Sequence, residues 1–106
     1  DVVTAGQIIA RLDTQTLEAR LASARAALAV AEASRAQTEA TMAEARAKAN
    51  RSEELALREL VSKQDLETNE AAALRAEAAV ESAKAQVTSN QASLKEALRI
   101  SFSINF

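Results

Sequence analysis

Apolar residues recur every seven positions along most of this chain. Between about residue 14 and residue 60 nothing breaks a helix, and two interleaved series of mostly apolar residues share one helical face. The first series contains Leu17, Ala24, Ala31, Thr38, Ala45 and Ser52, and the second contains Leu21, Leu28, Arg35, Met42, Ala49 and Ala56. This spacing predicts a helix over 14–60 whose seam faces a partner helix.

Two further series predict a second helix over about 64–99. They contain Leu66, Ala73, Val80, Val87 and Leu94, beside Asn69, Ala76, Ala83, Asn90 and Ala97. The registers of the two halves do not join between Leu60 and Asp65, and Ser62 stands three residues before Asp65, as an N-cap does. We therefore expect a turn near 60–64 and an antiparallel hairpin, with one unbroken helix as the alternative. The polar seam residues Arg35, Thr38, Asn69 and Asn90 are expected to fix the register of the pair.

Both ends of the chain have a different pattern. Ile8, Ala10 and Leu12 alternate with other residues after Gly6, which predicts a turn and a short strand before a helix cap at Asp13 or Thr14. The Ile/Phe-rich tail, residues 100–106, is expected to be β-like or disordered. The predicted fold is mostly α: a long antiparallel two-helix coiled-coil hairpin over 14–99, flanked by short β segments at 1–13 and 100–106.

Composition excludes several classes of function. The 106 residues include no Cys, His, Pro, Trp or Tyr, so zinc sites, thiol catalysis and Ser-His-Asp hydrolysis lack their residues. A net charge of -2 and two aromatic residues argue against a nucleic-acid partner. The acidic residues are expected to pair along the helices, as Glu54 with Arg58, and Glu77 and Glu81 near Lys84. We expect no enzyme activity, no metal and no cofactor.

The residues before the first predicted helix resemble a sequence motif of a known protein family. Gly6-Gln7-Ile8-Ile9-Ala10-Arg11-Leu12-Asp13, followed by an Ala-rich helical hairpin, is similar to the end of the first half of the lipoyl domain in periplasmic adaptor proteins, also called membrane fusion proteins. The family also shows Arg, three residues, Leu, six residues and Ser near the hairpin tip. Arg51, Leu55 and Ser62 have this spacing here, and Arg51 and Leu55 share one helix face because they are four residues apart.

The resemblance implies an adaptor of a tripartite efflux pump or a type I secretion system. Such a protein links an inner-membrane transporter, of RND or ABC type, to a TolC-like outer-membrane channel, which the tip residues Arg51, Leu55 and Ser62 would contact. The family implies a periplasmic location at the inner membrane and a homo-oligomer, as a hexamer.

Two other interpretations compete with the adaptor. A lipoyl carrier needs a modified Lys between strands, but the first Lys is Lys48, deep in a predicted helix. A structural coiled-coil rod without a transport role remains the alternative, although a rod does not require the sequence motif at 6–13. After residue 99 the chain lacks the Pro and Gly with which the family usually returns to the lipoyl domain.

Overall fold

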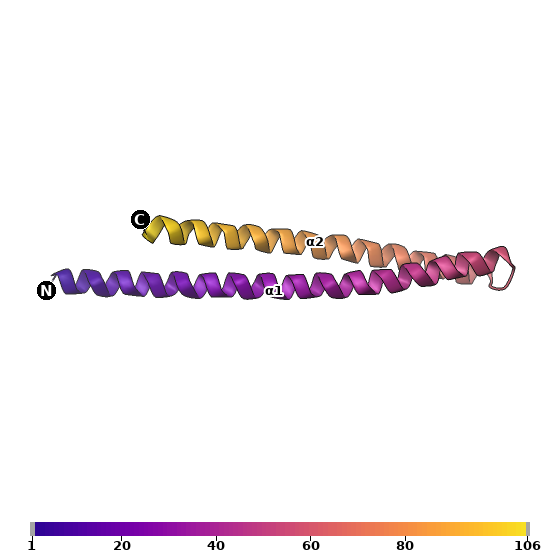
Figure 1. The fold of residues 1–106 in the computed structure, drawn as a ribbon, viewed down its shortest axis with the longest axis horizontal. Coiled ribbons are helices and arrows are strands. Elements are labelled where there is room, and N and C mark those ends of the chain that lie inside the picture. The colour runs from indigo at the N-terminus through magenta and orange to yellow at the C-terminus, as the bar shows by residue number, and fades with distance from the viewer. Residues whose placement is uncertain (1, 106) are drawn as a thin grey trace. The chain divides into compact units, whose positions relative to one another are not determined.

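The structure, a computed structural model, describes residues 2–105 as two long helices. Helix α1 spans Val2–Leu57 and helix α2 spans Lys63–Asn105 (Figure 1). Both helices are rich in Ala, Glu, Arg, Lys and Gln, which lose little side-chain freedom in a helix, and no Pro interrupts them. The composition thus explains why neither helix breaks before its end.

Each helix contributes to two compact units. One unit is Ala31–Val87, which contains the turn, and the other combines Asp1–Val30 with Thr88–Phe106. Within the Ala31–Val87 unit the end of α1 and the start of α2 run antiparallel on either side of the turn (Figure 1). The predicted antiparallel two-helix arrangement is confirmed in this unit.

The seven-residue seam is confirmed position by position. Every residue of the four predicted series is buried or half-buried. The most deeply buried residues all belong to these series, and they are Ala31, Ala49, Ser52, Ala73, Val80 and Val87. Four of these six are Ala or Ser, so the helices of the Ala31–Val87 unit pack closely through small side chains, and the two valines are the largest of the six.

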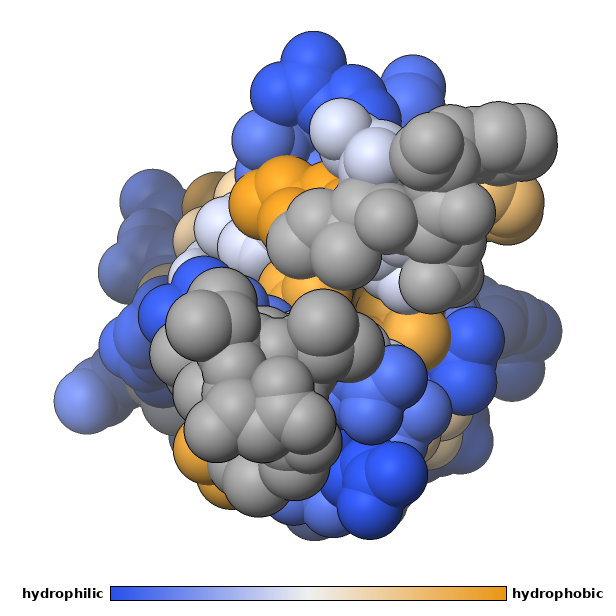
Figure 2. Space-filling model, turned by 90° about the vertical axis from the view of Figure 1, so that its left-hand side faces the viewer, coloured by the Kyte–Doolittle hydropathy of each residue, from blue (hydrophilic) through white to orange (hydrophobic). Residues whose placement is uncertain are grey.

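The unit formed by residues 1–30 and 88–106 has a looser seam. Its larger seam residues, among them Leu17, Leu21, Leu28 and Leu94, are half-buried. The Asn90 side chain donates a hydrogen bond from Nδ2 to the backbone carbonyl of Ala27, at 3.2 Å, which joins the two helices. In the view toward the end with the termini, most of the visible outer surface is hydrophilic, and several hydrophobic residues show near the middle of the view (Figure 2).

The expected β segments at the ends of the chain are not observed. Residues 2–13 continue α1 and residues 100–105 continue α2, and residues 2–105 contain no strand. A strand needs a partner strand for its backbone N–H and C=O groups, whereas a helix satisfies these groups internally. Gly6 adopts no positive φ and is accommodated in the helix. Asp1 and Phe106, which the predicted segments included, lie outside the described residues.

Candidate functional site at the turn between the helices

Helix α1 ends in a hydrogen-bonded turn that fixes the direction of the chain. Glu59 has a φ of 57°, in the left-handed region. The N–H of Leu60 donates to the carbonyl of Leu55 at 2.9 Å, and the N–H of Glu59 donates to that of Ala56 at 3.0 Å. This pair of bonds is the Schellman motif, with Glu59 at the position that Gly usually occupies. A side chain there costs about 1 kcal/mol, so the turn holds a strained residue.

Helix α2 begins with the cap that the sequence predicts. The N–H of Asp65 donates to Oγ of Ser62 at 3.0 Å, and the N–H of Leu66 donates to the carbonyl of Ser62 at 3.1 Å. Ser62 is therefore the N-cap residue of α2, and Asp65 lies in the first turn, where a negative charge is favourable. The predicted turn at 60–64 is observed at 58–62, between the two helix ends.

The three candidate tip residues all lie on the surface of the Ala31–Val87 unit. Arg51 and Leu55 are on the last two turns of α1, and both are exposed. Ser62 is also exposed, at the other side of the turn, and its hydroxyl already holds the α2 cap. The structure thus brings these residues to the same end of the helix pair, and Ser62 has a structural role there. That they contact a channel stays a prediction.

Two exposed leucines in the turn region escaped the sequence reasoning. Leu57 is 83% exposed and Leu60 is 66% exposed, whereas the predicted contact residue Leu55 is only 36% exposed. A signal was present in the sequence, because the seam series ends at Ala56 and neither leucine falls on it. The exposed fractions show that the hairpin itself covers little of either side chain.

A polar pair crosses the seam next to the turn. Nδ2 of Asn69, on α2, donates a hydrogen bond to Oγ of Ser52, on α1. Ser52 is buried and Asn69 is half-buried, so the bond compensates the cost of burying both groups. Asn69 and Asn90 thus fix the register as predicted. Arg35 and Thr38 do not, because their bonds go to Glu39 and to the backbone of Arg35, within α1.

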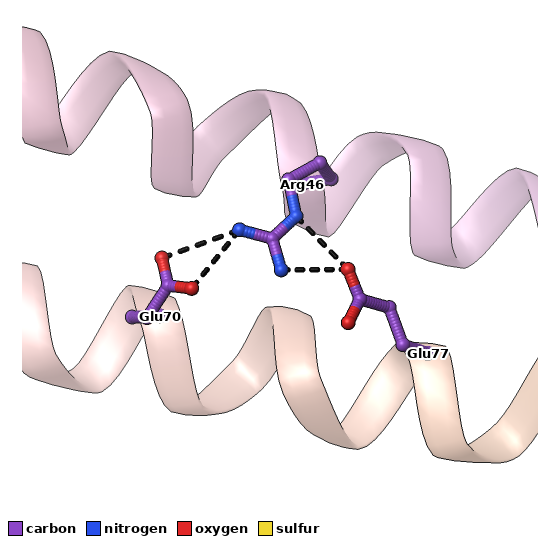
Figure 3. Close-up of polar contacts among 3 residues, drawn as sticks. All are labelled: Arg46, Glu70 and Glu77. Atoms are coloured by element: carbon purple, nitrogen blue, oxygen red, sulfur yellow. Dashed lines mark hydrogen bonds and ion pairs between the residues drawn. The ribbon is translucent and has the colours of Figure 1, made fainter.

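Arg46 bridges two acidic residues of the facing helix (Figure 3). Its Nη2 lies 2.6 Å from Oε1 of Glu77, and its Nη1 lies 3.0 Å from Oε1 of Glu70. The hydrogen bonds to Glu77 and then to Glu70 raise the pKa of Arg46 above its ordinary value. Since the two glutamates are seven residues apart on α2, one guanidinium ties two successive repeats to α1.

The bridge corrects one predicted pairing and adds a residue that the sequence reasoning missed. Glu77 pairs with Arg46, whereas Lys84 lies 3.6 Å from Glu81. The predicted Glu54–Arg58 pair is confirmed at 3.5 Å. Arg46 could have been found, since it directly follows a seam residue, as do Glu70 and Glu77. Residues beside the seam are those that form ion pairs between helices.

A groove lies beside the bridge, and we assign no catalytic or metal-binding role to it. It has a volume of about 410 Å³ and is lined by Arg46, Glu53, Leu66, Glu67 and Glu70. Among the described residues there is no group of three or more acidic residues placed to hold a metal ion. No helix in the described part of the chain has a stretch apolar and long enough to cross a membrane.

These features define a class of protein: a helical hairpin with an Ala-rich seam, interhelical polar pairs and a turn that exposes apolar side chains. A family model for the RND MFP alpha-helical hairpin domain matches residues 27–98, which is more than half of the chain. The chain therefore belongs to the membrane fusion protein family, as the sequence resemblance indicated. No curated protein and no solved structure matches it. The match begins at residue 27, so the lipoyl resemblance of residues 6–13 stays a prediction.

Proposed function

We propose that this hairpin is the part of a periplasmic adaptor that reaches a TolC-like outer-membrane channel, in an efflux system with an RND-type inner-membrane transporter. The family match to the RND MFP hairpin domain carries the proposal and favours RND over ABC transport. The adaptor acts by contact and has no catalytic role. In this proposal the protein is periplasmic and associated with the inner membrane.

The exposed end of the Ala31–Val87 unit supports channel contact at the turn. Arg51 offers a guanidinium that hydrogen-bonds carbonyl or carboxylate groups, and Leu55 offers an apolar side chain one helical turn away. Ser62 holds the start of α2 beside them. A cation and an apolar side chain on one helix face suit a groove between the helices of a partner.

Exposed alanines on the outer face of α1 support the proposed oligomer. They repeat at alternating steps of three and four residues: Ala19, Ala22, Ala26, Ala29, Ala33, Ala36, Ala40, Ala43 and Ala47. This is the spacing of a second seam, on residues that α2 does not cover. Side-by-side packing of hairpins, as in the proposed hexamer, would bury it. Sedimentation is the test: the protein is expected to form oligomers at high concentration, and a strictly monomeric species would contradict the hexamer.

Export in cells tests the channel contact. Arg51→Ala is expected to abolish export and Leu55→Ser to reduce it, when each is introduced into the gene in its own host. Both variants are expected to keep the helix content unchanged, because both side chains are exposed. Drug susceptibility measures export, and circular dichroism of the purified variants measures folding. Wild-type export by both variants would contradict channel contact and favour the structural coiled-coil rod.

A further inference from the structure

The end of the Ala31–Val87 unit presents two leucines that the hairpin itself does not use. Leu57 ends α1 and is 83% exposed, and Leu60 lies in the turn and is 66% exposed. They are three residues apart, on either side of Arg58 and Glu59. Neither belongs to the seam series, which ends just before them at the half-buried Ala56.

Hydrogen bonds fix the backbone of the turn that carries these side chains. The N–H of Leu60 is bonded to the carbonyl of Leu55, and Glu59 has the left-handed conformation that closes the α1 end. Ser62 then caps α2 two residues later. Both ends of the turn are therefore tied by hydrogen bonds, so the exposure of Leu60 is a property of an ordered segment. An apolar side chain on an ordered segment binds at a lower cost in conformational entropy than one on a loose loop.

The charges around the leucines indicate what kind of surface they fit. Residues 51–65 carry three basic and four acidic side chains, and they include no aromatic residue. An anionic lipid surface favours a basic face with bulky aromatic residues, which this segment lacks. Arg58 is moreover paired with Glu54, at 3.5 Å. A protein surface with apolar grooves and charges of both signs is the complementary partner.

We propose that Leu57 and Leu60 are the main apolar contact residues of the tip, and that they fit apolar grooves between helices of the same outer-membrane channel. This inference rests on the proposed function and extends it. Leu55, the leucine of the family pattern, then contributes less than these two because only a third of it is exposed. The exposed area of each leucine limits what it can gain by binding.

The test compares leucines that differ in place but not in chemistry. Leu57→Ser and Leu60→Ser are made singly in the protein expressed from its own gene in its host. Leu74→Ser is the matched control, because Leu74 is 56% exposed on α2 but lies eleven residues beyond the start of that helix. Drug susceptibility reports export, and binding of the purified variants to the host's purified outer-membrane channel reports affinity. Circular dichroism confirms helix content for each variant.

We expect Leu57→Ser and Leu60→Ser each to weaken channel binding about tenfold and to reduce export, while Leu74→Ser changes affinity less than about twofold. Wild-type binding by both tip variants, while Arg51→Ala abolishes it, would overturn this inference and keep the proposed function. Wild-type binding and export by the tip variants and by Arg51→Ala together would overturn both. An equal loss from Leu74→Ser would also overturn the inference, because the effect would not be confined to the tip.

Discussion

Replacement of Val80 by Ala tests the seam directly, because Val80 is 4% exposed and is one of two valines among the deeply buried residues. The change removes two methyl groups, which costs about 1.6 kcal/mol of apolar burial. Ala recovers about 0.5 kcal/mol through its higher helix propensity. The expected net loss is about 1 kcal/mol, and any cavity that remains at the site adds to it.

The same substitution at an exposed position is the control. Val30 is 70% exposed, so Val30→Ala loses little burial but has the same gain in helix propensity. We expect Val30→Ala to be neutral or stabilising by up to about 0.5 kcal/mol. The two variants should therefore differ by about 1.5 kcal/mol although their chemistry is identical.

Thermal unfolding followed by circular dichroism measures this difference. For a chain of this size, 1 kcal/mol shifts the Tm by about 4–8 °C, so Val80→Ala is expected to lower the Tm by about 5 °C and Val30→Ala to leave it unchanged or raise it. Equal Tm shifts for the two variants would refute the burial of Val80 in the seam. The substitution would then have the same effect on the buried and on the exposed side of the helices.

Four further predictions concern the polar groups and the turn. Asn69→Ala should cost about 1–2 kcal/mol by leaving the Ser52 hydroxyl without its partner, whereas adding Ser52→Ala should recover part of this loss in urea denaturation; a purely additive double variant would contradict the pair. Ser62→Ala should cost about 1 kcal/mol and Ser62→Asp almost nothing in the same assay, because Asp caps a helix as well as Ser, so equal losses would argue against the cap. Glu59→Gly should raise stability by about 1 kcal/mol by relieving the left-handed residue, and a lower Tm would contradict that conformation. The pKa of Arg46 is raised on folding, so the charged guanidinium stabilises the fold at every pH below its ordinary pKa, and this stabilisation is lost only as the pH rises above that value. The Tm difference between the wild type and Arg46→Gln should therefore stay constant from about pH 7 to about pH 10. A decline of this difference over that range would contradict the prediction.

The central part of the fold could be predicted from the sequence because the seam repeats without interruption. Ala73, Val80 and Val87 are seven residues apart, and only a helix with a facing partner buries such a series. The turn was predictable for a related reason. The register breaks near residue 61 and Ser62 supplies a helix cap, so two local signals agree on one place.

The ends of the chain could not be predicted in the same way. Alternation at Ile8, Ala10 and Leu12 is compatible with a strand, but a strand forms only where another strand accepts its hydrogen bonds. This requirement is tertiary, and a short pattern contains no information about it. Residues 2–13 are helical in the structure, where each backbone group bonds within its own segment.

The candidate site was predictable in outline but not in detail. Spacing identified Arg51 and Leu55 as neighbours on one face, and both are exposed at the end of α1. The exposure of Leu57 depends on where the α1 helix ends, which the sequence placed three residues too late. The bridge from Arg46 to Glu70 depends on the register of the two helices, which is a tertiary property that the Asn69–Ser52 and Asn90–Ala27 hydrogen bonds help to fix.

Photo-crosslinking from the turn tests the central claim most directly. A photoreactive amino acid replaces Leu57 in one variant and Leu74 in another, and both are expressed in the host of the protein and irradiated in intact cells. The account predicts a covalent adduct between residue 57 and the outer-membrane channel, identified by mass spectrometry, and no such adduct from residue 74. A protein that exports normally but gives no channel adduct from residue 57, or gives equal adducts from both positions, would contradict docking through the hairpin tip.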